Sequence, residues 1–213
     1  MAQQTFTRLY DDHDDAMHVV QALETAGVPH ADISLVSNDA DSRHNGAGTG
    51  ASTTGVTSGD PEQGASTGAG TGATMGTVLG GGAGLLAGLG ALAIPGIGPI
   101  VAAGWLVATL TGAGVGAAAG GLFGSLTGAG VSEADAHVHA EGVRRGGTLV
   151  TVRADQARAA DIEAVLDGRT PVDLTARRAE YQTEGWTQHD LAAPAYSAEQ
   201  VTTERKRRVV RVS

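Results

Sequence analysis

Residues 76–130 read GTVLGGGAGLLAGLGALAIPGIGPIVAAGWLVATLTGAGVGAAAGGLFGSLTGAG, two apolar segments joined by a turn-forming stretch at residues 95–99. Glycine recurs at four-residue spacing in both segments, and residues four apart lie on one face of a helix. The pattern predicts an antiparallel helical hairpin packed through glycine stripes, which we call the glycine zipper. Its packing and assembly residues are Gly76, Gly80, Gly84, Gly88, Gly104, Gly112, Gly116, Gly120, Gly124 and Gly128, and its turn residues are Pro95, Gly96, Gly98 and Pro99.

This hairpin is apolar enough to enter a bilayer, because no charged residue occurs between Gln63 and Ser132. A membrane-spanning helix needs about 20 apolar residues, and residues 75–94 and 100–126 each supply that length. Small residues at this spacing also allow close helix packing in lipid. Three interpretations stay open: a membrane-embedded hairpin, a water-soluble oligomer of hairpins, and a disordered segment, against which the strict spacing argues. We expect membrane association with both termini cytoplasmic, and a soluble cytoplasmic protein is the alternative.

The residues before this region predict a β-α-β half over residues 1–37. Residues 5–10 alternate polar and apolar side chains as a strand does, and Asp11 or Asp12 can cap a following helix. Gly27 can end that helix, and residues 33–36 predict a second strand. Residues 38–72 are mostly Asn, Asp, Ser, Thr and Gly. They have little apolar surface to bury, so we expect a flexible linker.

The residues after the hairpin predict a short helix and a second β-α-β half over residues 131–186. Ser132, followed three residues later by Asp135, resembles a capping box for a helix over residues 133–144. A strand at 148–152, an amphipathic helix at 159–166 and a short strand at 171–174 follow. Beyond residue 186 the apolar pattern dissolves, so residues 187–213 are expected to form a disordered tail with a basic end.

Together the two halves predict an α+β, ferredoxin-like fold, a four-stranded sheet with two helices on one face. The linker (38–72) and the glycine-zipper hairpin (73–130) interrupt this fold between its second and third strands. A hairpin returns the chain to the side from which it started, which lets the two halves meet.

Composition excludes several classes of function. A net charge of −9 argues against nucleic-acid binding, and the lack of cysteine excludes disulfides, thiolate catalysis and cysteine zinc sites. No Lys or Arg lies between Arg43 and Arg144, so a phosphate-binding loop lacks its lysine. The first residues have no apolar core of the signal-peptide type. We expect no catalytic residue, cofactor or small-molecule substrate, no specific nucleic acid, and a homo-oligomer with a lipid bilayer as a possible partner.

Two polar clusters contain side chains that could bind a metal ion. Asp135, His137, His139 and Glu141 alternate along a predicted helix, where residues two apart point away from each other. We therefore expect a solvated helix surface there and no metal site. The acidic residues of the stretch 11–18 are explained by the favourable position of carboxylates at a helix N-terminus.

Basic residues occur at two further places. Arg144 and Arg145 end a predicted helix, where cations are favoured, and lipid phosphates are the alternative partner. Residues 205–208 and Arg211 form a basic run near the end of the chain. A membrane contact, a nucleic-acid contact and a solvated tail are its three interpretations, and we favour the solvated tail.

The order of several segments resembles the bacterial general stress protein (heat-induced stress protein) domain family, over roughly residues 5–186. The segments are residues 7–12 with Ala16 and Val20, then 33–36, 94–99, 130–136 and 141–150. The resemblance implies a protein associated with heat, cold or general stress, without established enzyme activity, built as a split α/β domain around a glycine-zipper hairpin. The linker is long and polar for this family, and the basic end beyond Tyr196 has no counterpart in it.

We therefore expect a non-enzymatic general stress-response protein that associates with membrane or self-assembles through its glycine zipper. The alternative is a soluble oligomeric ligand-sensing or regulatory module that uses the ferredoxin-like sheet.

Overall fold

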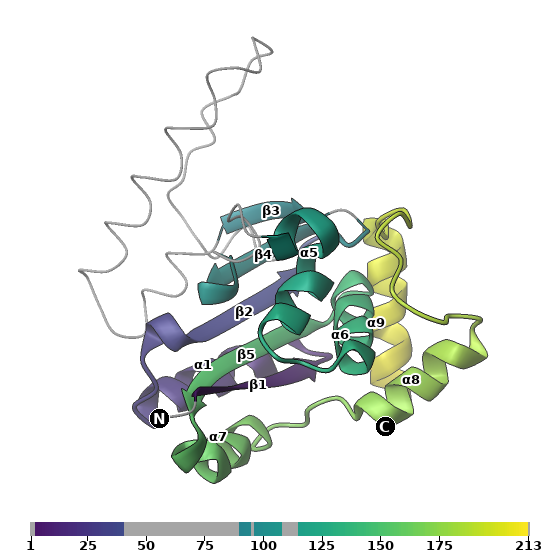
Figure 1. Ribbon diagram of the computed structural model, residues 1–213. Coiled ribbons are helices and arrows are strands. Elements are labelled where there is room, and N and C mark those ends of the chain that lie inside the picture. The colour runs from purple at the N-terminus through teal and green to yellow at the C-terminus, as the bar shows by residue number, and fades with distance from the viewer. Residues whose placement is uncertain (1–2, 41–89, 95, 108–114, 213) are drawn as a thin grey trace, which may run out of the picture.

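The computed structural model describes residues 3–40, 90–94, 96–107 and 115–212 (Figure 1). They form an α+β structure around an antiparallel sheet with the strand order β1-β5-β2-β4-β3. The strands are β1 (Gln3–Tyr10), β2 (Ile33–Asn38), β3 (Gly90–Ile94), β4 (Gly98–Gly104) and β5 (Thr148–Asp155). The helices are α1 (His13–Thr25), α5 (Val115–Gly128), α6 (Glu133–Arg144), α7 (Ala159–Leu166), α8 (Leu174–Thr183) and α9 (Ala198–Val212), with short 3-10 turns at His30–Asp32 and Gln156–Arg158.

The predicted elements of the first half are confirmed, with the expected local chemistry. The side chain of Asp12 caps α1 by accepting a hydrogen bond from the Asp14 amide at 2.7 Å. Gly27 follows the helix with φ 81°, a conformation that glycine adopts without a steric cost. The next strand, β2, lies at the centre of the sheet, and all six of its residues are buried.

In the second half, the cap of α6 and the elements β5 and α7 are also confirmed. The Ser132 hydroxyl accepts from the Asp135 amide at 3.2 Å and donates to the Asp135 carboxylate at 2.7 Å. These two bonds satisfy part of the exposed start of the helix, as a capping box does. The chain then enters β5, which pairs with β1 on one side and β2 on the other.

Helices cover both faces of the sheet, whereas the predicted fold has helices on one face only (Figure 1). Successive strand residues point to opposite faces, so Tyr10 packs with α1 and α7, and Leu9 packs with α5 and α6. Gly142 brings α6 close to β1, because a Cβ atom there would lie 2.3 Å from Leu9 Cδ2. The second layer of helices creates a second core, and it buries part of α6 that was expected to face solvent.

The prediction of helices is wrong for residues 90–104, which form the antiparallel pair β3 and β4. The turn lies within the predicted stretch, and Gly96 and Gly98 have positive φ values of 77° and 100°. The predicted turn residues Gly98 and Pro99 belong to β4, where Pro99 pairs with Ala93. However, this turn joins two strands. These residues fall in the gap between the two glycine series, and β4 contains Ile100 and Val101, whose branched side chains favour strands.

Gly104 was predicted to lie in a helical glycine stripe but ends β4 with φ 92°. A Cβ atom here would lie 2.1 Å from the carbonyl oxygen of Ile33, so glycine is required for the approach of β4 to β2. The helix α5 contains Gly116, Gly120, Gly124 and Gly128, and it bends at Gly121. The remaining glycine-zipper and turn residues lie outside the described residues: Gly76, Gly80, Gly84, Gly88, Gly112 and Pro95. The predicted linker lies there too, apart from its first residues, 38–40.

The predicted strand at residues 171–174 does not form. Its contact with the sheet is one backbone hydrogen bond, from the Val172 amide to the Leu9 carbonyl at 2.8 Å. Asp173 then caps α8 by accepting from the amides of Thr175 and Ala176, at 2.8 and 3.1 Å. Because of this cap, the chain begins α8 directly after its single backbone hydrogen bond to β1.

The prediction of a disordered tail is also wrong, because α9 spans most of the basic end. Val201 is fully buried, and a Cβ atom at Gly146 would lie 2.7 Å from its Cγ1. The Arg205 side chain donates to the Gly146 carbonyl at 2.9 Å, so α9 is fixed against the end of α6 (Figure 1). Before this helix, the chain at residues 190–191 contacts the turn between β3 and β4 at Gly96.

Candidate functional site

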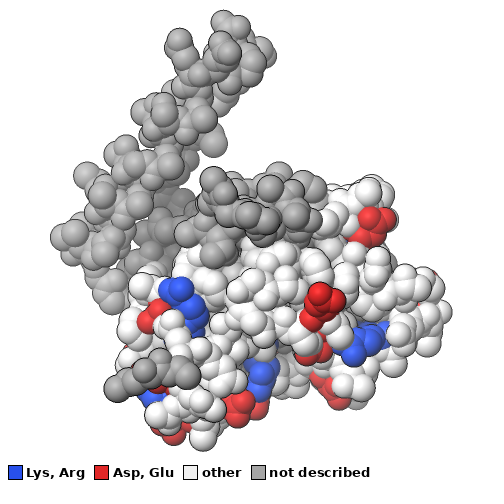
Figure 2. Space-filling model, in the orientation of Figure 1, with Lys and Arg blue, Asp and Glu red and all other residues white. Residues whose placement is uncertain are grey.

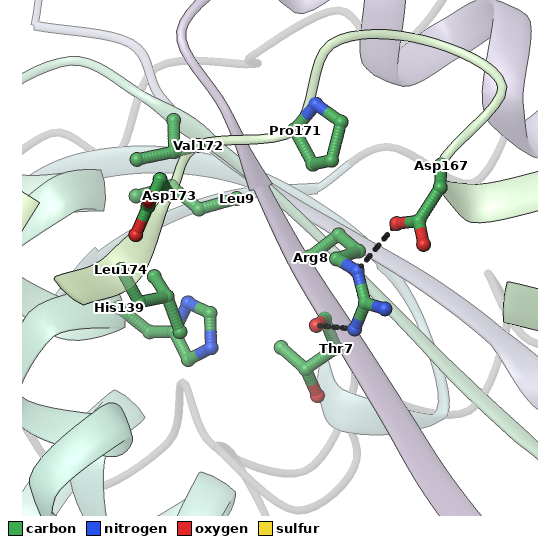
Figure 3. Close-up of a pocket in the computed structure, with 9 residues that line it drawn as sticks. All are labelled: Thr7, Arg8, Leu9, His139, Asp167, Pro171, Val172, Asp173 and Leu174. Atoms are coloured by element: carbon green, nitrogen blue, oxygen red, sulfur yellow. Dashed lines mark hydrogen bonds and ion pairs between the residues drawn. The ribbon is translucent and has the colours of Figure 1, made fainter. Parts of the chain in front are cut away.

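A cavity of about 400 Å³ opens at the free edge of β1 (Figure 3). We call it the β1-edge pocket. Its walls come from β1, from α6, and from the loop that runs from α7 to α8. The lining residues are Thr7, Arg8, Leu9, His139, Asp167, Pro171, Val172, Asp173 and Leu174.

The early departure of residues 171–174 from β1 explains why the pocket exists. In an antiparallel ladder every second residue directs its backbone groups to the same edge. Leu9 uses its outward carbonyl to accept from Val172, so Thr7 directs its own backbone groups to that edge as well. The Thr7 carbonyl accepts from Arg8 Nη1 at 3.1 Å, and no strand pairs there in the described part of the chain. The space that a fourth strand would fill is left open.

His139 on α6 forms the buried wall of the pocket and is only 2% exposed. Its Nδ1 atom has no hydrogen-bond partner among the described residues. Burial lowers the pKa of His139 to about 4, with Arg8 lowering and Asp135 raising it by smaller effects. The imidazole is therefore neutral near pH 7, and a neutral imidazole has one donor and one acceptor nitrogen.

Arg8 and Asp167 form the opposite, more open wall (Figure 3). The Arg8 Nε donates to the Asp167 carboxylate at 2.9 Å, and the two side chains are 30% and 52% exposed. The end of α7, which carries Asp167, is held against β1 by the Tyr10 hydroxyl, which donates to the Leu166 carbonyl at 2.7 Å. The Nη2 group of Arg8 has no partner within the described ranges, so the guanidinium retains donors for a ligand.

A second polar cluster surrounds Glu141, two residues after His139, and we call it the Glu141 network. This carboxylate is 1% exposed and accepts from Arg145 Nε at 2.8 Å, Arg144 Nη1 at 3.0 Å and His189 Nδ1 at 3.3 Å. Burial alone would raise the pKa of Glu141, but the bonds from His189 and the arginines outweigh it and lower the pKa to about 2. Arg145 also pairs with Glu184 and lies over the Tyr181 ring.

The Glu141 network continues into the basic end of the chain. Arg177 donates to both oxygens of Asp11, at 2.9 and 2.6 Å, and Arg208 lies 3.0 Å from the same carboxylate. Arg208 also donates to the Arg145 carbonyl at 3.2 Å. These bonds join α6, α8 and α9 into a structural network, in which Arg144 Nε, His189 Nε2 and Tyr181 Oη have no hydrogen-bond partner among the described residues.

Several sequence-based expectations are corrected here. His139 and Glu141 are buried, so the stretch 135–141 is not a solvated helix surface. Arg144 and Arg145 end α6 as predicted, and Arg145 is buried and paired. The prediction of a solvated tail is wrong for Arg208, which is buried and paired with Asp11.

The remaining candidates take ordinary roles. His137 stacks on Phe123 at 4.3 Å, and Asp135 pairs with Arg178 at 3.1 Å. In the described part of the chain, no group of three acidic or histidine side chains is placed to hold a metal ion. On the face seen in Figure 2, acidic and basic side chains alternate around an uncharged centre, and no large basic patch is visible.

Comparisons of this chain with protein-family models, with curated proteins and with solved structures found no match. None of the helices within the described ranges has both the length and the apolar character that crossing a membrane requires.

Proposed function

We propose that this chain is a non-enzymatic stress-response protein whose α+β domain senses a small molecule bound in the β1-edge pocket. The observation that carries the proposal is the buried His139, which lines a cavity without a hydrogen-bond partner in the described residues. Leaving a buried polar group unpaired costs about 1–3 kcal/mol. A ligand would give this imidazole a hydrogen-bond partner through the part of the ring that lines the cavity. The link to stress rests on the resemblance of the sequence.

The proposal of binding without catalysis rests on the polar groups around the pocket. A catalytic histidine needs a second group that orients it beside a nucleophile or substrate, and no described side chain bonds to His139. The pocket carboxylates have structural partners, since Asp167 pairs with Arg8 and Asp173 caps α8. This arrangement suits recognition, in which a ligand completes a preformed set of donors and acceptors.

We further propose that the domain is a variant of the ferredoxin-like plan. In support, β5 of the second half lies between β1 and β2 of the first half, and α1 and α7 share one core. The single bond from Val172 to Leu9 then stands where the fourth strand would pair with β1. In this reading the β1-edge pocket is the site opened by the shortened fourth strand.

Ligand-observed fluorine NMR with a library of small fragments tests the proposed binding on the full chain. Thr7→Phe should fill the pocket and abolish binding of the fragments that occupy it. Thr5→Phe is the matched control, since Thr5 lies on the same face of β1 and does not line the pocket. If no fragment binds, or if both variants bind every fragment as the original chain does, the ligand-sensing function is wrong.

Self-assembly or membrane association through the glycine zipper is the second candidate function. The observation that favours it is the four-residue glycine spacing in a stretch without charged residues. A second copy of the chain or a lipid bilayer would cover the apolar faces, with both chain termini in the cytoplasm. The segment is attached to the rest of the sheet by the pairing of β4 with β2, which is consistent with an assembly element carried by a folded domain.

This second candidate is tested by replacing Gly80 and Gly116 together with Leu. The double variant should lose oligomer size or carbonate-resistant membrane retention, because Leu keeps helix backbones apart. Leu at Gly50 and Gly55, outside the spacing pattern, is the control. Unchanged oligomer size and unchanged fractionation of the zipper variant would contradict the packing mechanism.

A further inference from the structure

We propose that the β1-edge pocket binds a small zwitterion with an apolar side chain, of the chemical class of an aliphatic α-amino acid. This inference rests on the ligand-sensing function proposed above and names its ligand class. It follows from three groups of lining residues: a guanidinium with unused donors, a buried acceptor beside carboxylates, and an apolar wall between them.

The first group would bind a carboxylate. Arg8 uses Nε for Asp167 and Nη1 for the Thr7 carbonyl, and these two bonds fix the plane of the guanidinium. The N–H groups of Nη2 remain, and an arginine held in this way presents them in a fixed geometry. A ligand carboxylate could therefore bind without displacing Asp167.

The second group would bind an ammonium group. His139 is neutral near pH 7, so one of its nitrogens accepts a hydrogen bond. Asp173 lies on the same side of the pocket as His139 (Figure 3). Both amides that it caps bond to Oδ1, which leaves Oδ2 without a partner among the described residues. An ammonium group at this end would meet a neutral acceptor and a carboxylate oxygen.

The third group would contact an aliphatic side chain. Leu9 and Pro171 lie between the two polar ends of the pocket, and Val172 and Leu174 lie at the end with Asp173 and His139 (Figure 3). Leu9 is fully buried, and Val172 and Leu174 are half-buried and pack against the same core cluster. This apolar wall therefore continues the hydrophobic core. Burying an aliphatic group here removes apolar surface from water.

Charge balance favours a zwitterion over an ion of one sign. The lining residues comprise one guanidinium, two carboxylates and a neutral imidazole. A simple anion would add to the existing excess of negative charge, and a simple amine would leave the unused donors of Arg8 without an acceptor. A zwitterion leaves the net charge unchanged and matches both ends.

Isothermal titration calorimetry of the full chain near pH 7 tests the assignment with three probes of similar shape. The probes are L-leucine, isocaproate, which lacks the amine, and isoamylamine, which lacks the carboxylate. L-leucine should bind about tenfold or more tightly than either analogue, since each analogue loses a charge-assisted hydrogen bond. Arg8→Gln should weaken the binding of L-leucine by about tenfold and leave the affinity for isoamylamine unchanged. Arg169→Gln, at an exposed arginine that does not line the pocket, is the control.

The outcomes separate this inference from the proposed function. If fragments bind in a Thr7→Phe-sensitive manner but L-leucine binds no better than its analogues, the zwitterion class is wrong and ligand sensing stands. If Arg8→Gln leaves L-leucine binding unchanged, the assignment of its carboxylate to Arg8 is overturned. If no probe and no fragment depends on the pocket, both proposals fail.

Discussion

His139 and Glu141 lie two residues apart on α6 and are almost equally buried, at 2% and 1% exposure. They differ in their partners. Three side chains donate hydrogen bonds to Glu141, whereas Nδ1 of His139 has no described partner. Burial by itself therefore does not distinguish a structural polar group from a binding group. The distinction lies in whether the fold satisfies the group or leaves it open to a cavity.

The two neighbourhoods differ because α6 contacts different kinds of element on its two sides. On one side, the carboxylate of Glu141 accepts from Arg144 and Arg145 at the end of α6 and from His189 in the segment between α8 and α9. Arg205 and Arg208 of α9 donate to backbone carbonyls at the same end of α6. On the other side, α6 lies near the edge of β1, where the predicted strand does not form because Asp173 caps α8. We infer that the Glu141 network stabilises the fold and that the β1-edge pocket binds a small-molecule ligand.

The largest expected effect is the loss of stability on removing the charge of Glu141. Glu141→Gln leaves Arg144 and Arg145 buried without their shared carboxylate, and removing one partner of a buried ion pair costs about 3–5 kcal/mol. Urea denaturation followed by circular dichroism measures the free energy of unfolding.

Glu184→Gln is the matched control, because Glu184 also pairs with Arg145 but is 35% exposed. A partly solvated pair contributes about 1 kcal/mol or less. Equal losses in the two variants would show that burial of Glu141 does not set the energy of the network.

The second expected effect is on the dependence of stability on pH. The pKa of His139 is about 4 in the folded chain and ordinarily 6.5. Between these values the unfolded chain takes up a proton that folded His139 does not. The free energy of unfolding therefore falls as pH decreases from 6.5 to 4, by at most about 1.4 kcal/mol per pH unit from this group. Glu141 contributes to the pH dependence at lower pH, between its ordinary pKa of 4.5 and its folded pKa of about 2.

Comparing the original chain with His139→Leu by urea denaturation at several pH values isolates this contribution. The variant should lose the part of the slope between pH 6.5 and pH 4 that comes from His139, keep the part from His137, whose pKa burial also lowers, and keep the loss of stability at lower pH. Near pH 7 it should be as stable as the original or more stable by about 1 kcal/mol, because an unpaired buried polar group is removed. His18→Leu, at an exposed histidine of α1, is the control. An unchanged slope in His139→Leu would mean that folding does not lower the pKa of His139.

The sequence predicted the elements whose signals are local. The capping side chains of Asp12 and Ser132 and the glycine after α1 determine element ends within a few residues, and these ends are confirmed. The hairpin at residues 90–104 was mispredicted because β4 pairs with β2, more than sixty residues earlier in the chain, and β3 then pairs with β4. Helical spacing of the flanking glycines carried no information about that partner.

The candidate site could not be predicted, because it depends on contacts between distant segments. The stretch 135–141 read as one alternating polar pattern, yet His139 lines the pocket beside β1, whereas Glu141 meets His189 from the segment between α8 and α9. The basic end read as a solvated tail because the partners of Arg208 are a carboxylate at Asp11 and a carbonyl at Arg145. Asp173 is the instructive case, since a cap signal after Pro171 and Val172 was present in the sequence and outweighed the strand pattern.

The smallest expected effect concerns Arg8, whose bond to Asp167 is as short as that of Arg145 to Glu141, at 2.9 and 2.8 Å. The exposed fractions differ, at 30% and 52% for the Arg8 pair against 6% and 1% for the Arg145 pair. Arg8→Gln should therefore lower the free energy of unfolding by about 1 kcal/mol or less, and high salt should reduce the difference. Urea denaturation at low and high salt measures both. A loss as large as that of Glu141→Gln would make Arg8 a structural residue like Arg145, and the contrast between a satisfied network and an open pocket would no longer hold at this wall.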